Sequence, residues 1–126
     1  MTNSKMNLAS RVLLGVLTLV ILAFTIPAYV DTANNPALAY LSGANAGLGG
    51  VAGAFLGRQI TLALIAAYGV IKPNKQTLMI GGFAIAAFNL HDAFMLFAFG
   101  SGGAGAIAGV VLGVLGLAVM YLASKE

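Results

Sequence analysis

The chain has 126 residues, of which 60% are hydrophobic and 7% are charged, and its mean hydropathy is +1.00. A soluble domain carries about 25% charged residues, so a chain this short and apolar cannot cover a water-facing surface and is expected to use lipid as its solvent. The net charge of +3 comes from six scattered basic residues, which form no stripe for nucleic acid. The absence of cysteine excludes disulfides, thiolate metal sites and cysteine nucleophiles.

The first apolar run, Val12–Ile26, follows a short polar start with two basic residues. This pattern resembles a secretory signal peptide, but the small-x-small cleavage site is poor because Ile26-Pro27-Ala28 begins with a bulky residue. We therefore predict a retained transmembrane helix over residues 11–30, with Pro27 in its last turn. A helix of twenty residues is about 30 Å long, which matches the hydrocarbon core of a bilayer.

Three more helices are predicted, over residues 48–71, 76–99 and 104–122. Residues 31–47 form the longest connection, in which Pro36–Leu41 is either a short interfacial helix or a coil. Lys72-Pro73-Asn74-Lys75 predicts an antiparallel hairpin between the second and third helices, and Gly100–Gly103 predicts a tight turn before the fourth. The predicted fold is therefore all-α: residues 1–126 form one integral membrane four-helix bundle.

The basic residues outside the apolar runs fall on one side of the predicted membrane. With four spans, that side receives both termini and the turn at 72–75. Its basic residues are Lys5, Arg11, Lys72, Lys75 and Lys125. The other side has none, and the positive-inside rule then predicts that both termini are cytoplasmic, in a bacterial inner membrane.

A few polar residues lie deep inside the second and third helices. They are Arg58, Gln59, Asn89, His91 and Asp92. Ionisable groups at that depth are costly, so they tend to pair, to face a bundle interior and to mark function. Counting outward equally along both helices from the turn near Asn74 puts Arg58 level with Leu90, between Asn89 and Asp92. We predict an Arg58–Asp92 ion pair with the other polar residues nearby.

Three roles remain open for this cluster. It fixes helix register as a structural pair, lines a pocket for a small lipophilic or anionic ligand, or passes protons or ions. His91 is expected to point about 100° away from Asp92 around the helix. A second histidine is absent, so haem ligation by two histidines of one chain is excluded, and a single axial bond from His91 to a pigment or haem stays open. We otherwise predict no cofactor and no metal site.

Two of the predicted helices carry glycine repeats at four-residue spacing. The positions are Gly49, Gly53 and Gly57, and then Gly105, Gly109 and Gly113. Small residues let helices approach closely in lipid, where no hydrophobic force drives them together. One repeat is expected to pack inside the bundle and the other to face a second copy or a membrane-protein partner.

The stretches Gly57-Arg58-Gln59 and Asn89-Leu90-His91-Asp92, with Pro27 near the end of the first helix, resemble small bacterial four-helix membrane proteins of the DoxX-like type and related domains of unknown function. The resemblance covers nearly the whole chain. It implies the four-helix architecture more than an activity.

Signatures of catalysis are missing from the sequence. Serine, histidine and acid do not fall at triad-like positions, and no two carboxylates share a helix face. An enzyme is therefore the less favoured hypothesis. The leading one is a non-catalytic accessory subunit or self-associating bundle with a buried Arg–Asp cluster. The alternative is a binder or carrier of a small lipophilic or anionic ligand in the outer half of the bundle.

Overall fold

Four long helices make up the structure. The computed structural model describes the backbone of residues 2–100 and 103–125, with side chains from residue 8 onward. The long helices are α1 (Thr2–Thr25), α2 (Val51–Ile71), α3 (Lys75–Phe99) and α4 (Gly103–Ser124). Three short 3-10 helices lie between α1 and α2, namely η1 (Ile26–Tyr29), η2 (Thr32–Asn34) and η3 (Gly43–Ala46). The predicted all-α architecture with four helices is confirmed.

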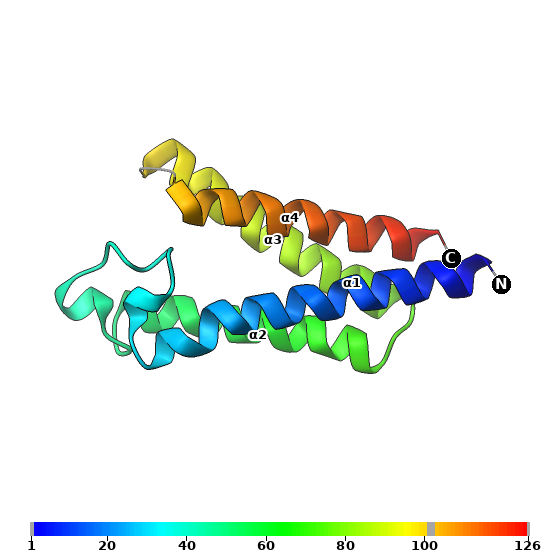
Figure 1. The fold of residues 1–126 in the computed structure, drawn as a ribbon, viewed down its shortest axis with the longest axis horizontal. Helices are drawn as coiled ribbons and strands as arrows, with labels where there is room; N and C mark the ends of the chain where they lie inside the picture. Colours follow the sequence, from blue (N-terminus) through cyan, green and yellow to red (C-terminus); the bar gives the residue numbers. More distant parts are fainter. Residues whose placement is uncertain (1, 101–102, 126) are drawn as a thin grey trace.

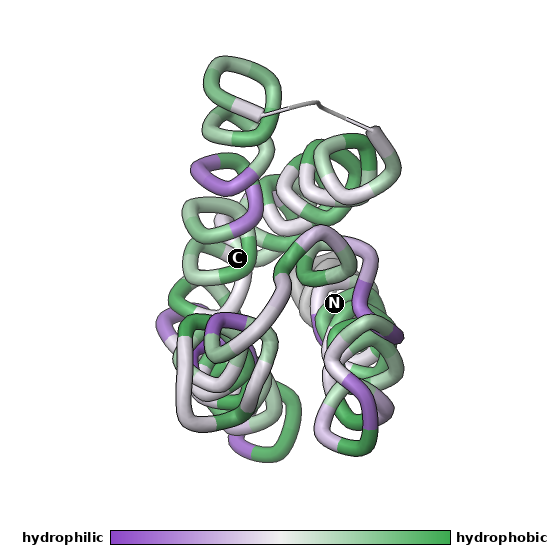
Figure 2. The backbone as a smooth tube through the Cα atoms, turned by 90° about the vertical axis from the view of Figure 1, so that its left-hand side faces the viewer, coloured by the Kyte–Doolittle hydropathy of each residue, from purple (hydrophilic) through white to green (hydrophobic). Residues whose placement is uncertain are grey.

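All four helices are long and apolar enough to span a membrane. Large hydrophobic side chains such as Leu19, Ile71 and Phe94 are exposed on the outside of the bundle. Figure 2 looks along the bundle and shows apolar residues on all sides of the helices. A helix at the surface of a soluble protein instead carries one apolar stripe facing the core. This surface is of the kind that multi-pass membrane proteins present to lipid.

The helices form two pairs, α1 with α2 and α3 with α4, which meet at one end of the molecule and diverge at the other (Figure 1). Both termini and the α2–α3 turn lie at the end where the pairs meet, here called the closed end (Figure 1). The long connection between α1 and α2 lies at the opposite, open end. The arrangement agrees with an even number of spans.

The main hydrophobic core lies where the two pairs meet. Its largest fully buried side chains are Leu14, Leu17, Leu78, Ile85 and Val119, from α1, α3 and α4. Two hydrogen bonds add to this packing: the Ser10 hydroxyl donates to the Val119 carbonyl at 3.1 Å, and Arg11 Nε donates to the Val70 carbonyl at 2.7 Å. They tie α1 to α4 and to the end of α2.

The glycine repeat of α4 packs inside the bundle, against α3. A Cβ added at Gly109 would lie 2.8 Å from the Asn89 carbonyl oxygen. One at Gly116, three residues beyond the repeat, would lie 2.7 Å from the Ala86 amide nitrogen. The two helices therefore touch through their backbones. The repeat on the second helix behaves differently. A Cβ at Gly49 or Gly57 would meet no described neighbouring segment within 4 Å, and the nearest atoms to one at Gly53 would all belong to Leu48, just before α2.

The helix boundaries differ from the predicted ones mainly at the first two helices. The first starts at Thr2, nine positions before the predicted residue 11, and its α-helix ends at Thr25. Pro27 then sits in the first turn of η1, where its missing N–H costs nothing. The second helix starts at Val51 instead of residue 48, after Gly50 in an extended conformation.

The connection between α1 and α2 folds back over the open end. Pro36–Leu41, left open as helix or coil, forms a series of turns. Asn35 is 5% exposed; its side chain donates to the Phe24 carbonyl at 3.2 Å and accepts from the Ala37 amide at 2.9 Å. Leu38 is buried in a second small core with Ala28, Ala52 and Leu56. The loop is thus anchored against the ends of α1 and α2.

Candidate functional site

The site lies between α2 and α3, which leave their shared turn in close contact and separate toward the open end. Asn74 caps α3, because its side chain accepts from the Thr77 amide at 2.9 Å and its own amide donates to the Thr77 hydroxyl at 3.0 Å. Next to the turn, a Cβ at Gly69 would lie 2.8 Å from the Thr77 carbonyl oxygen. Farther out the two helices no longer touch backbone to backbone, and larger side chains fill the gap.

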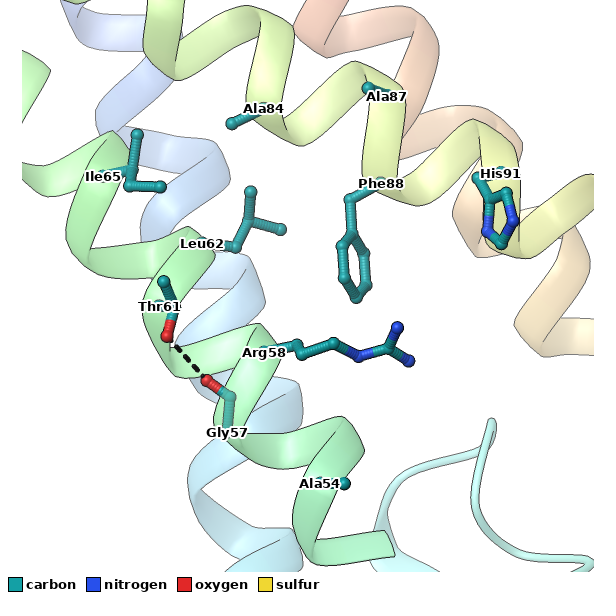
Figure 3. Close-up of a pocket in the computed structure, with 10 residues that line it drawn as sticks. All are labelled: Ala54, Gly57, Arg58, Thr61, Leu62, Ile65, Ala84, Ala87, Phe88 and His91. Carbon is teal, nitrogen blue, oxygen red and sulfur yellow. Dashed lines mark hydrogen bonds between the residues drawn. The ribbon is translucent and has the colours of Figure 1, made fainter. Parts of the chain in front are cut away.

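Arg58 extends from α2 toward α3 and lies over an aromatic ring (Figure 3). Its guanidinium carbon is 5.2 Å from the centroid of the Phe88 ring, a cation–π geometry. Phe88 also meets Phe55 with a centroid distance of 6.4 Å and an interplanar angle of 56°. Arg58 is therefore opposite Phe88, two residues from the predicted level at Leu90.

The predicted Arg58–Asp92 ion pair is not formed. Among the side chains of residues 8–100 and 103–125, the one ion contact joins His91 Nδ1 and Asp92 Oδ1, at 3.3 Å. Phe88 and Asp92 are one helical turn apart on the same face of α3, so the aromatic ring reaches the guanidinium first. The two charged side chains nevertheless line one cavity, described below.

His91 and Ala87 line a groove between α2 and α3, which is described below. The His91 ring also reaches back to the neighbouring Asp92, which the expected 100° separation did not anticipate. Rotation about the side-chain bonds brings the two polar groups together although they leave the helix in different directions. The His91 side chain is 65% exposed and that of Asp92 is 26% exposed.

A groove of about 850 Å³ runs between α2 and α3 and opens sideways, out of the bundle; we call it the lateral groove (Figure 3). Its walls are mainly Leu62, Ile65, Ala84 and Phe88. The Thr61 hydroxyl in its wall already donates to the Gly57 carbonyl at 2.9 Å. The polar groups left to face a ligand are those of Arg58 and His91.

The lateral groove continues in both directions along α2. Toward the closed end it meets a hollow of about 340 Å³, which shares Thr61 and Ile65 with it. Toward the open end Arg58 also lines a cavity of about 310 Å³ beneath the α1–α2 connection, here called the loop cavity. Tyr40 and Asp92 are on its walls. One apolar track thus leads from beneath the loop, past Arg58, along most of α2.

A fourth space, the inner chamber, has a volume of about 250 Å³ and lies between the two helix pairs. It shares Asp92 and Phe55 with the loop cavity. Asn89, 5% exposed, donates through Nδ2 to the Ile85 carbonyl at 2.9 Å. The Gln59 Oε1 atom is buried and has no hydrogen-bond partner in the part of the chain that the structure describes.

The five predicted polar residues therefore separate into two groups that share one wall. Arg58 and His91 face the lateral groove, and Gln59 and Asn89 face the inner chamber. Asp92 lies between them. No group of three metal-ligating acidic or histidine side chains occurs among the residues that the structure describes.

Sequence reasoning did not assign a role to Phe88, Phe55 or Asn35. Phe88 carried a usable signal, since it precedes Asp92 by four residues and lies nearly level with Arg58. Asn35 carried none, because its burial depends on how the long loop folds back.

Comparison with protein-family models, with curated proteins and with solved structures finds no match to this chain. The resemblance to DoxX-like proteins stays a prediction from the sequence.

Proposed function

We propose that this chain is a multi-pass membrane protein that binds an amphiphile bearing an anionic group, with the anion at Arg58 and the apolar tail in the lateral groove. This was the alternative function hypothesis from the sequence. It is favoured over a self-contained Arg–Asp cluster by one observation: the Arg58 guanidinium lies in a mostly apolar groove with no carboxylate in ion-pair distance among the described residues.

The energetic reason is the cost of a lone charge in lipid. An unpaired arginine near the middle of a bilayer costs between about 3 and 17 kcal/mol, depending on the method. A cation–π contact returns about 2 kcal/mol when it is desolvated. Between about 1 and 15 kcal/mol is then left for an anion to offset. Carboxylate and phosphate groups match the planar guanidinium with two parallel hydrogen bonds.

The shape of the track fits an amphiphile. From Arg58 to Tyr68 the groove and its continuation follow ten residues of α2, or about 15 Å. Half of a bilayer's hydrocarbon core is also about 15 Å thick. Arg58 is seven residues from Val51, so the anionic group would lie roughly 10 Å below the open end of α2. The loop cavity supplies a route to that depth.

The proposed orientation follows from charge. Arg11, Lys72, Lys75 and Lys125 belong to segments at the closed end, and the described part of the open end carries Asp31 and no basic residue. The positive-inside rule supports a cytoplasmic closed end with both termini, in a bacterial inner membrane. The ligand would then enter from the outer leaflet.

A lipid titration followed by native mass spectrometry tests this function. The protein in phosphatidylcholine nanodiscs is offered oleate or phosphatidylglycerol, which distinguishes a carboxylate ligand from a phosphate one. Arg58→Gln should weaken binding of the preferred anion about tenfold or more, because a hydrogen bond to a charged group contributes about 1.5–3 kcal/mol and 1.4 kcal/mol is tenfold. Lys75→Gln, at an exposed position outside every cavity described above, is the matched control.

A large side chain placed in the lateral groove tests whether the ligand's tail binds there. Ala87→Phe puts a ring into the lateral groove from an exposed position and should reduce binding, whereas Ala98→Phe, exposed on α3 outside the groove, should not. Equal binding by Arg58→Gln and the parent protein would overturn the proposal. A stable dimer that Ala87→Phe disrupts would also overturn it, in favour of a second copy as the occupant.

A further inference from the structure

The charges around the loop cavity indicate more about the ligand's head group than that it must carry an anion. Arg58 and Asp92 both line this cavity and carry formal charges of opposite sign. A head group with only negative charge would meet Asp92 as well as Arg58, and like charges close together in a low dielectric repel strongly. A head group with both signs would complement both walls.

The inner chamber adds to this pattern, because two hydrogen-bond acceptors, from Gln59 and Asp92, lie on its walls. The Gln59 oxygen is buried and unpartnered in the described structure, and the Asp92 carboxylate lies on the wall that the chamber shares with the loop cavity. One side-chain amide hydrogen of Asn89 and one of Asn35 are directed to backbone carbonyls. A buried acceptor left without a donor is costly, so this chamber is complementary to a group that donates hydrogen bonds.

We infer that the ligand is a zwitterionic amphiphile whose anionic group contacts Arg58 and whose protonated amine lies at Asp92 and Gln59. This inference rests on the proposed function and names its ligand class. A primary ammonium has three N–H donors, enough for the Asp92 carboxylate and the Gln59 oxygen. A quaternary ammonium has none, and a head group without nitrogen leaves Asp92 with only its contact to His91. The chamber volume of about 250 Å³ is ample for a small amine-bearing head group.

The test compares head groups on one acyl scaffold. Phosphatidylethanolamine carries a phosphate and a primary ammonium, phosphatidylglycerol a phosphate alone, and phosphatidylcholine a phosphate with a quaternary ammonium. Each is titrated into detergent-solubilised protein and read by native mass spectrometry. Phosphatidylethanolamine should bind at least tenfold more tightly than the other two. Soluble phosphoethanolamine should compete weakly, because it lacks the tail.

Two substitutions locate the preference. Asp92→Asn should weaken phosphatidylethanolamine binding about tenfold and should strengthen phosphatidylglycerol binding, since it removes a repulsion. Gln59→Met keeps the side-chain length, removes the acceptor and should lower only the preference for the primary amine. Gln76→Met, at an exposed glutamine near the α2–α3 turn, is the control. If Asp92→Asn fails to fold, Gln59→Met still tests the preference for the primary amine.

The outcomes separate this inference from the proposed function. If phosphatidylglycerol binds as well as phosphatidylethanolamine while Arg58→Gln weakens both, the zwitterion inference fails and the anionic-amphiphile function stands. If Arg58→Gln changes no affinity, both fail. If soluble phosphoethanolamine binds as tightly as the lipid, the groove contributes nothing and the amphiphile proposal fails, whatever the head-group preference.

Discussion

The guanidinium carbon of Arg58 lies 5.2 Å from the centroid of the Phe88 ring. Phe88 is one helical turn from Asp92 on α3. The cation is therefore held by a ring that stabilises it without neutralising it. Its charge stays available at the junction of the lateral groove and the loop cavity.

The first prediction concerns the energetic partner of Arg58. A double-mutant cycle with Arg58→Gln and Phe88→Leu should give a coupling free energy of about 0.5–2 kcal/mol, the range for cation–π contacts. The measurement is the free energy of unfolding in detergent from denaturant titration. Phe94→Leu, at an exposed aromatic position on the same helix, should add to Arg58→Gln without coupling. Strict additivity in the Phe88 cycle would show that the ring does not hold the cation.

The same approach applies to the ion pair that the sequence suggested. In ligand-free protein, the double variant Arg58→Ala/Asp92→Ala should have a lower free energy of unfolding than either single variant, because the two side chains are not in ion-pair contact. A pair that formed a buried salt bridge would behave differently, with the double variant milder than either single one. That second result would mean that the two side chains meet when the site is empty, and it would contradict the geometry described here.

The α3–α4 contact should be intolerant of any added side chain. Gly116→Ala places a methyl group 2.7 Å from the Ala86 amide nitrogen and should cost about 1–3 kcal/mol of unfolding free energy by overpacking. Gly57→Ala is the matched change in the open groove. It should be neutral or stabilising by up to about 1 kcal/mol, because alanine favours helix. Equal losses at the two positions would show that α2 also packs through its glycine repeat.

The buried hydrogen bond between α1 and α4 should contribute measurably. Ser10→Ala removes the hydroxyl that donates to the Val119 carbonyl at 3.1 Å and should lower the free energy of unfolding by about 1 kcal/mol. Ser124→Ala, whose exposed hydroxyl donates to the Tyr121 carbonyl within its own helix, should change it by less than about 0.5 kcal/mol. Thermal unfolding followed by circular dichroism reads both.

Membrane topology is testable by cysteine labelling, since the chain has no native cysteine. Ala39→Cys, in the connection at the open end, should react with a membrane-impermeant maleimide in intact bacterial spheroplasts. Lys75→Cys, at the start of α3, should react only after the membrane is permeabilised. Labelling in the reverse order would invert the proposed orientation and would place the Arg58 side of the groove in the inner leaflet.

The position of Arg58 relative to α3 could be predicted from the sequence only in part. The hairpin turn at Lys72–Lys75 and the regular rise of a helix were enough to place Arg58 within two residues of its true level on α3. They were not enough to choose between Phe88 and Asp92, because both lie on the same face one turn apart. That choice depends on how far α2 and α3 separate, which is set by packing against α1 and α4.

The glycine repeats show the same limit. Their spacing predicted close helix contact, and the α4 repeat makes it against α3. The α2 repeat has the same spacing and leaves Gly57 in the wall of an open groove. Spacing alone does not tell the two apart, because the difference lies in whether a second helix crosses at that face.

Photocrosslinking shows directly whether a lipid tail occupies the lateral groove. A phospholipid with an ethanolamine head group and a diazirine in one acyl chain is added to the protein in bilayer nanodiscs, irradiated, and its attachment sites are mapped by peptide mass spectrometry. Attachment should concentrate on the walls of the lateral groove, at residues 61–65 and 84–88, and should fall sharply in Arg58→Gln. Attachment spread evenly over the outer faces of α1 and α4, and unchanged in Arg58→Gln, would contradict a specific lipid site.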